Sequence, residues 1–253
     1  MVGVFDNEDY SESTLEWRDK KHPTRHNKTD YEAFRRRQQK DREVSEKRRR
    51  QRMHEVIGRN LEKWRQSVSA RWKDADLKEI EREQSRAILK QIDEKGFVSF
   101  FFYGDTGIGK TYHAYAVIKE YIRRGKISPA QVVVLNEGQL LDYVSTGFEG
   151  RNKLSEVLSD KYKFYFIDDI GRGGSAPEDK RNAMWDRVMD HLYANDVNFV
   201  MTSNFTLKGL ADNFSDAAFD RLMLKTMERR IEFTGGNYRH KLAKEERRRR
   251  PQG

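Results

Sequence analysis

The chain has 253 residues, of which 50 are Lys or Arg and 41 are Asp or Glu, with no cysteine and 36% hydrophobic residues. The lack of cysteine excludes a disulfide-bonded secreted framework. No apolar run approaches the roughly 18 residues that are needed to cross a bilayer, and the first ten residues are acidic instead of leading from a basic stretch into an apolar one. We therefore expect a cytoplasmic protein without a membrane anchor. The net charge of +9 is compatible with a nucleic-acid partner and does not establish one.

The N-terminal quarter is basic and poor in apolar residues. Residues 31–65 contain 13 Lys or Arg, 6 Asp or Glu, one Gly and no Pro, which favours a long, solvent-exposed helix. This arm either follows DNA phosphates, docks on a protein partner or is only a solvated helix, and its sequence leaves these interpretations open. The apolar residues that favour docking somewhat are Phe34, Val56, Ile57, Leu61 and Trp64. We expect a mostly helical or flexible partner-binding segment at 1–65, a folded domain at 66–241 and a basic tail at 242–253.

Beyond residue 66, helical and strand-like segments alternate along the chain. An apolar helical pattern comes first, between Trp72 and Gly96. We then expect strands at 97–103, 131–135, 163–168, 198–202 and 230–234, with helices at 110–124, 138–143, 153–159, 181–193 and within 207–225. Strands that are separated by helices predict an α/β fold in which helices cover both faces of a parallel sheet.

The strongest motif is a phosphate-binding loop. Residues 104–111 read GDTGIGKT, which fits G-x-x-x-x-G-K-[ST], and they lie between an apolar strand pattern and a helical one. Glycines let the backbone N–H groups surround an anion, the Lys reaches the outer phosphates, and the Thr hydroxyl can hold Mg²⁺. The residues that we expect to bind nucleotide are Gly104, Asp105, Thr106, Gly107, Ile108, Gly109, Lys110 and Thr111.

Polar side chains follow two later strands. An apolar run leads into Asp168 and Asp169, a pattern typical of a carboxylate that leaves a central strand to meet Mg²⁺. We expect Asp168 to support the metal and Asp169 to orient the attacking water. The strand at 198–202 is followed by Asn204, which either contacts the γ-phosphate or the water, or only begins a turn. His113, on the helix after the loop, is expected to be a packed side chain and not a catalyst.

In their order and spacing these motifs resemble the AAA+ ATPases, and more narrowly the DnaC and DnaI helicase loaders with the IstB-like proteins. The resemblance covers about residues 69–241 and rests on GDTGIGKT, FIDDIG, TSN, FDRL and GGNYR. It implies an AAA+ P-loop NTPase with a five-stranded parallel sheet flanked by helices and preceded by a charged helical arm.

The same resemblance implies an ATPase that uses ATP and Mg²⁺. Asp169 stands where these ATPases commonly have Glu, one methylene longer, which leaves the rate of hydrolysis open. Asn204 would be the sensor, and Arg221 would be an arginine finger that reaches the nucleotide of a neighbouring subunit. Arg239 matches the terminal Tyr-Arg pair of the family and is a further candidate nucleotide contact.

The resemblance finally implies partners: a hexameric DnaB-type replicative helicase, single-stranded DNA, and other copies of the chain in a head-to-tail spiral or ring, with no membrane. The family places DNA contacts in the loop after the second strand, which nominates Phe148, Arg151 and Lys153, although Phe148 is equally compatible with core packing. Arg172 is a second candidate. The nearest alternative is an IstB-like transposition helper that acts on duplex DNA with a transposase. A small-molecule kinase and a non-catalytic DNA-binding adaptor are more distant alternatives.

Overall fold

The computed structural model describes residues 25–80, 82–145, 153–171 and 176–236, with side chains from residue 32 onward. The chain divides into two compact units, Met1–His54 and Glu55–Gly253. The described part of the first unit belongs to helix α2 (Arg25–Ser67), and the last turns of this helix belong to the second unit. Within the described residues, no helix has both the length and the apolar character that crossing a bilayer requires.

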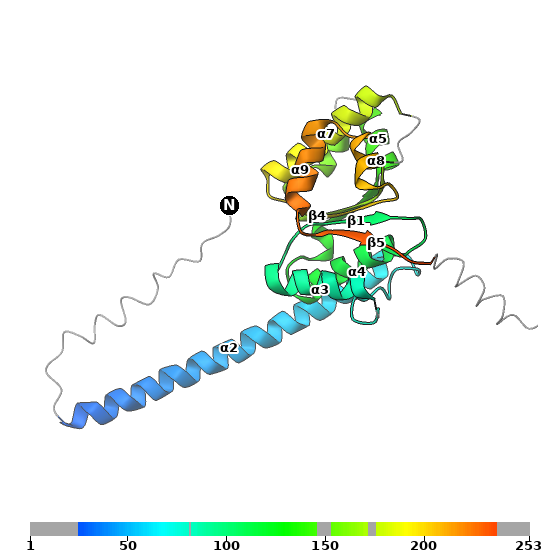
Figure 1. Cartoon of the computed structure of the whole chain (residues 1–253). Coiled ribbons are helices and arrows are strands. Elements are labelled where there is room, and N and C mark those ends of the chain that lie inside the picture. The colour runs from blue at the N-terminus through cyan, green and yellow to red at the C-terminus, as the bar shows by residue number, and fades with distance from the viewer. Residues whose placement is uncertain (1–24, 81, 146–152, 172–175, 237–253) are drawn as a thin grey trace, which may run out of the picture. The chain divides into compact units, whose positions relative to one another are not determined.

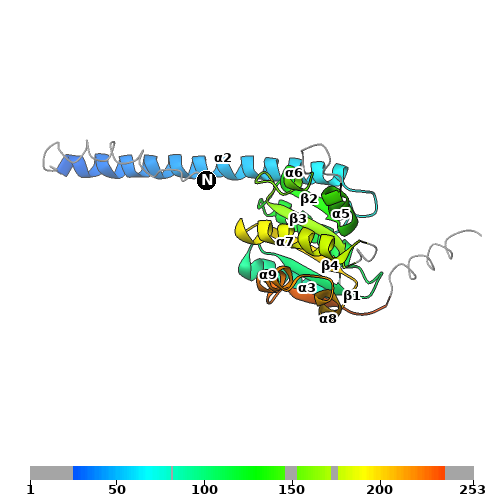
Figure 2. The same cartoon turned by 90° about the horizontal axis from the view of Figure 1, so that it is seen from above.

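The second unit is built on a five-stranded parallel sheet, as expected from the sequence (Figure 1). Its strands lie in the order β2-β3-β4-β1-β5, and neighbouring strands are parallel throughout (Figure 2). The bounds of the strands are β1 (Phe100–Gly104), β2 (Val132–Asn136), β3 (Phe164–Ile170), β4 (Asn198–Ser203) and β5 (Arg230–Phe233). Because β4 lies between β1 and β3, the polar residues that end these three strands meet at one edge of the sheet.

Helices cover both faces of this sheet, which explains why its central strands are apolar without alternation. Phe100, Phe101 and Phe102 of β1 are all fully buried, and consecutive residues face opposite sides. On one face lie the end of α2, α3 (Glu83–Lys95) and α4 (Lys110–Arg123). The other face packs against α5 (Glu137–Ser145), α6 (Lys153–Val157), α7 (Glu178–Ala194), α8 (Leu207–Ala211) and α9 (Asp216–Thr226).

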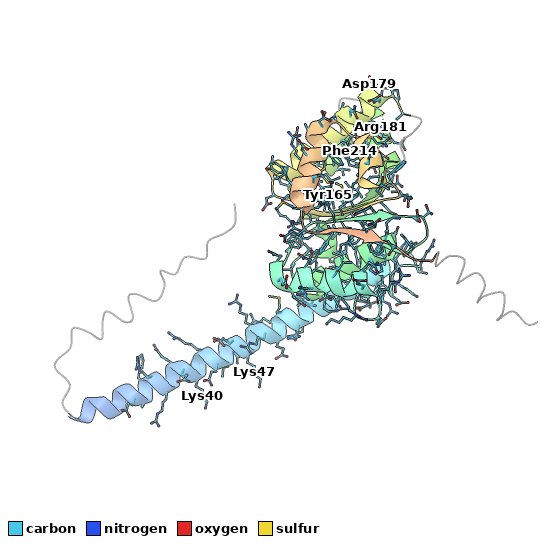
Figure 3. All side chains as sticks on the ribbon, in the orientation of Figure 1. Lys40, Lys47, Tyr165, Asp179, Arg181 and Phe214 are labelled. Carbon is cyan, nitrogen blue, oxygen red and sulfur yellow. The ribbon has the colours of Figure 1, made fainter. Side chains whose placement is uncertain are left out.

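The core between the sheet and helices α5 to α9 contains an aromatic pair and a buried hydrogen bond. Trp185 of α7 stacks on Phe214 with their ring centroids 4.5 Å apart, and its indole N–H donates to Glu137 Oε1 at 2.9 Å. Figure 3 shows Phe214 together with Arg181, whose guanidinium donates to the carbonyl of Asn213 at 3.3 Å. The buried indole N–H and guanidinium are therefore both paired, which offsets the cost of removing them from water.

The segment before the first strand differs from the expectation. The apolar pattern between Trp72 and Gly96 predicts a helix over that whole stretch, but α3 begins only at Glu83 and the preceding residues form turns. Asp76, which is 7% exposed, is held there by Arg123 of α4 and by Lys119 Nζ at 3.2 Å. These ion pairs fix the segment on the helix that follows the phosphate loop.

The end of α2 also belongs to the second unit. Trp64 is 4% exposed and lies with its ring 6.0 Å from that of Tyr115 on α4, and Leu61 packs against the same cluster. The expected boundary at residue 65 therefore lies about ten residues after the division between His54 and Glu55. The reason is that Leu61 and Trp64 contact the core of the folded domain.

Candidate active site

The loop between β1 and α4 has the backbone geometry of an anion cradle. Gly104, Gly107 and Gly109 all have positive φ angles, of 127°, 83° and 102°, which residues with a side chain rarely adopt. At Gly104 a Cβ atom would also lie 2.2 Å from the carbonyl oxygen of Phe233 on β5. Only glycine fits there, and Gly109 in the left-handed conformation directly precedes the first residue of α4. The loop therefore leads directly into the N-terminus of α4, and a helix N-terminus binds phosphate favourably.

Lys110 points into this loop. Its side chain is buried, and its ammonium group donates to the carbonyl oxygens of Gly104 and Asp105, each at 2.7 Å, and to Asn204 Oδ1 at 2.8 Å. A buried ammonium at the mouth of a loop of N–H groups supplies a positive charge for a bound phosphate. The structure thus brings together Lys110 and Asn204, which are 94 residues apart in the sequence.

Thr111 lies against the carboxylate that was expected to support a metal ion. Its hydroxyl is 3.0 Å from Asp168 Oδ1, and the hydroxyl of Thr202 donates to the same oxygen. A hydroxyl beside a carboxylate at the foot of a phosphate loop fits Mg²⁺, which is commonly held by one or two protein oxygens plus phosphate and water. Among the described residues, no group of three or more His, Cys, Asp or Glu side chains is placed to hold a metal ion.

The backbone bends at the two acids. The pairing of β3 with β4 shifts between Ile167 and Ile170, and Asp169 has a positive φ of 55°. The sequence predicts a strand that ends at Asp168, whereas β3 continues to Ile170 through this irregularity. A bulge of this kind redirects a side chain out of the regular alternation, and Asp tolerates the left-handed conformation better than most residues.

Asp169 is thereby brought to the sensor candidate. Asn204 Nδ2 donates to Asp169 Oδ1 at 2.8 Å while its own oxygen accepts from Lys110. Asn204 therefore links the lysine of the loop to the acid expected to orient water. The N–H of Asp169, displaced from the strand ladder, donates to Thr202 Oγ1 at 3.0 Å.

Thr202 belongs to the TSN motif but was given no role from the sequence, although it contacts both acids. It is fully buried, donates to Asp168 and accepts from Asp169. Its position between an apolar strand and the Ser203-Asn204 turn is the signal that could have identified it. Arg82, which donates to the carbonyl of Ile108 at 2.7 Å, was also missed, and nothing in its local sequence marks it.

The pKa of the Asp168 carboxyl is raised above its usual range. Burial is the main cause, and the negative charge of Asp169 adds to it, while hydrogen bonds from Thr202 and Thr111 act in the opposite direction. A carboxylate in such surroundings gains more than an exposed one from a nearby cation. Mg²⁺ would supply that charge and neutralise the oxygens of a bound phosphate.

His113 is packed behind the loop, in agreement with the expectation. It is 2% exposed, its Nδ1 is 2.8 Å from the carbonyl oxygen of Gly109, and its Nε2 is 3.0 Å from Ser85 Oγ. A carbonyl can only accept, so Nδ1 carries the proton and Nε2 accepts from the serine. His113 therefore joins α3 to the base of the phosphate loop.

We expect His113 to make the protein sensitive to mild acid. Burial lowers the pKa of its imidazole from 6.5 to about 4. In the unfolded chain the ring takes up a proton below pH 6.5, whereas in the folded chain it does so only near pH 4. The stability that depends on neutral His113 is complete above pH 6.5 and is lost as the pH falls toward 4, with about 2 kcal/mol lost by pH 5.

Urea unfolding at pH 7, 6 and 5 measures this loss, and His113→Gln is the control. The variant should lose less stability than the unchanged protein between pH 7 and 5. The pKa of His191 is also lowered by burial, but this residue is present in both proteins and cancels in the comparison. Equal pH dependence of the two proteins would contradict the assignment to His113.

The remaining candidates lie apart from this cluster or outside the described residues. Arg221 is on α9, partly exposed, and its guanidinium is 2.8 Å from Asp190 Oδ1 of α7. Lys153 is exposed at the first residue of α6. The other four candidates fall outside the residues that the structure describes: Phe148, Arg151, Arg172 and Arg239.

The fold is shared with solved structures of replication proteins. One is DnaI, with 18% identity and a TM-score of 0.52 over 68% of this chain and 94% of that one. Another is the DnaC helicase loader, with 18% identity and a TM-score of 0.53 over 66% of this chain and 100% of that one. A third is AMPPCP-bound DnaA from Aquifex aeolicus, with 17% identity and a TM-score of 0.52. The match covers 73% of this chain and 57% of the DnaA chain.

No curated protein sequence matches the chain significantly. Residues 100–234, which are 135 of the 253, match the profile of the "ATPase family associated with various cellular activities (AAA)". The match runs from β1 to the end of β5 and so includes the phosphate loop, both acids and Asn204. The chain belongs to the AAA family of ATPases.

Proposed function

We propose that this AAA ATPase binds a hexameric DnaB-type replicative helicase and places it on single-stranded DNA. The observation that carries the ATPase part is the chain of contacts from Lys110 through Asn204 to Asp169, beside the pair of Thr111 and Asp168. These contacts, with those of Thr202, join the residues proposed as phosphate-binding cation, metal-side acid and water-orienting acid in one hydrogen-bonded cluster. ATP and Mg²⁺ are the cofactors that suit this cluster.

In this proposal each group of the cluster has a separate task. The loop and Lys110 bind the phosphates, Thr111 and Asp168 hold Mg²⁺, and Asp169 orients the water that attacks the γ-phosphate. Asn204 senses the γ-phosphate, because it contacts both the lysine and the acid. Nucleotide state can thus be read by the position of a single amide side chain.

The helicase-loading part is supported by the fold. DnaI and the DnaC helicase loader share this fold over nearly their whole solved chains. The alternative, an IstB-like transposition helper, has the same kind of ATPase core and differs in its partner. Affinity purification from cells separates the two: recovery of a hexameric helicase supports the loader, and recovery of a transposase supports the alternative.

We further propose that subunits assemble head to tail, with Arg221 completing the nucleotide site of a neighbour. Its guanidinium is partly exposed and paired with the exposed carboxylate of Asp190 on the surface of the second unit. A planar, permanently charged group of this kind suits the charge that develops on a transferring phosphoryl group.

Arg221→Ala should leave ATP affinity within about threefold and lower DNA-stimulated hydrolysis roughly a hundredfold or more, as loss of an arginine finger does in other phosphoryl-transfer sites. Mixing it with Lys110→Ala subunits tests the geometry, because each variant then supplies what the other lacks. The mixture should regain part of the activity. Asp190→Ala serves as the control, since it removes the partner of Arg221 and keeps the arginine. Failure of the two variants to complement each other would count against a finger acting between subunits.

A further inference from the structure

The structure changes the balance between the interpretations of the basic arm. Docking on a protein was favoured by Phe34, Val56, Ile57, Leu61 and Trp64, but Leu61 and Trp64 pack against the core of the second unit. In the part of the arm that belongs to the first unit and has described side chains, 32–54, the large apolar residues are Phe34, Val44 and Met53. Successive helix positions turn by 100°, so these three fall on different sides and form no apolar face.

The same stretch is dominated by exposed positive charge. Residues 32–54 carry ten Lys or Arg and four Asp or Glu, and every one of these residues is exposed. Arg50 has an ion pair with Glu46 at 3.8 Å. Within the described residues, eight of the ten cations have neither an ion pair nor a hydrogen bond from their side chains: Arg36, Arg37, Lys40, Arg42, Lys47, Arg48, Arg49 and Arg52. Figure 3 shows the side chains of Lys40 and Lys47 extending away from the helix.

The charges surround the helix instead of lining one side. Residues 35–37 and 48–50 are two runs of three consecutive arginines, and three consecutive helical positions span about 200°. A protein partner binds one side of a helix and needs a buried anchor at the centre of the contact. A helix in the major groove of duplex DNA instead has phosphate backbones on both sides.

We propose that residues 32–54 of α2 bind the phosphate backbones of duplex DNA from within the major groove. Single-stranded DNA is less suitable, because its binding sites present several aromatic side chains on which bases stack, and this stretch contains one Phe and no Tyr or Trp. The inference does not depend on helicase loading. It adds a duplex contact to a protein whose proposed substrate is a single strand.

The test uses the full chain, without nucleotide, and a labelled duplex of about three helical turns, with fluorescence anisotropy between about 50 and 200 mM KCl. The arm variant changes Arg36, Arg37, Arg48 and Arg49 to Gln, which keeps a good helix former at each position. The matched control removes the same charge from exposed lysines of the second unit by changing Lys126, Lys163, Lys180 and Lys208 to Gln. Thermal unfolding and ATP binding confirm that each variant is folded.

The arm variant should bind duplex DNA at least roughly tenfold more weakly than the unchanged chain, and the slope of log affinity against log salt should fall by about 3 to 4 in magnitude. The control should keep both values. An equal loss in the two variants, no loss in either, or a loss confined to a single strand of the same length would overturn the assignment. If the unchanged chain does not bind a helicase, the loader proposal fails. The duplex-binding proposal is unaffected by that result, because the anisotropy measurement tests it separately.

Discussion

Lys110→Ala should lower the affinity of the protein for ATP roughly a hundredfold or more, because a contact between an ammonium group and phosphate contributes up to about 3 kcal/mol. Lys110 contacts the loop carbonyls of Gly104 and Asp105 as well as Asn204. Its removal takes away the positive charge at the centre of the cradle and leaves the neighbouring N–H groups as the remaining phosphate contacts. Titration with a fluorescent ATP analogue measures the affinity.

Lys126→Ala is the matched control, because this lysine is exposed just beyond the end of α4. It should bind ATP with unchanged affinity. Lys110→Met is a second variant that keeps most of the buried aliphatic chain, so that a loss of binding shared by both variants cannot be attributed to a cavity. ATP affinity within threefold of the unchanged protein in a folded Lys110→Met variant would remove the phosphate-loop assignment.

Asp169→Asn should lower the rate of ATP hydrolysis by a factor on the order of 10² to 10³ and leave ATP affinity within threefold. The amide matches the carboxylate in shape and also tolerates the positive φ of 55° at this position. Its oxygen can still accept the hydrogen bond from Asn204. What the variant loses is the negative charge that is proposed to orient and polarise the attacking water, so single-turnover hydrolysis is the appropriate measurement.

Asp212→Asn is the control for Asp169→Asn, since it makes the same chemical change at an exposed position after α8. It should hydrolyse ATP at the unchanged rate. A hydrolysis rate in Asp169→Asn equal to that of the control would show that another group orients the water. A loss of ATP binding in Asp169→Asn would instead place Asp169 among the binding residues.

The sheet and the phosphate loop could be predicted from the sequence because their signals are local. Five apolar runs separated by helical patterns define the strands, and GDTGIGKT fixes the loop between β1 and α4. The meeting of Lys110, Asn204 and Asp169 follows from the strand order, in which β4 lies between β1 and β3. These parts need no knowledge of individual side-chain contacts.

Other parts depend on contacts that the sequence does not display. The apolar spacing from Trp72 onward suits a helix, but the ion pairs of Asp76 with Arg123 and Lys119 hold turns there instead. The bulge at Asp169 depends on Thr202, whose hydroxyl takes the place of a ladder partner for the Asp169 N–H. The role of a residue such as Thr202 can be identified only once the strand that pairs with its own strand is known.

The partner of the basic arm also depends on contacts that the sequence does not display. The sequence shows how many charges the arm has, and its apolar residues suggest a protein partner. In the structure, Trp64 is buried in the second unit, and Arg48 and Arg49 are exposed without a counter-charge among the described residues. The composition of a segment therefore predicts its exposure better than its partner.

Transfer of a hexameric DnaB-type helicase from the same source onto a closed single-stranded DNA circle tests the loader proposal most directly. Helicase that stays with the circle during gel filtration is measured with the unchanged chain, with Lys110→Met and without added protein. We predict ATP-dependent transfer with the unchanged chain and background transfer in the other two cases. Transfer that is equally efficient without this chain, or no binding of the helicase to it, would contradict the account.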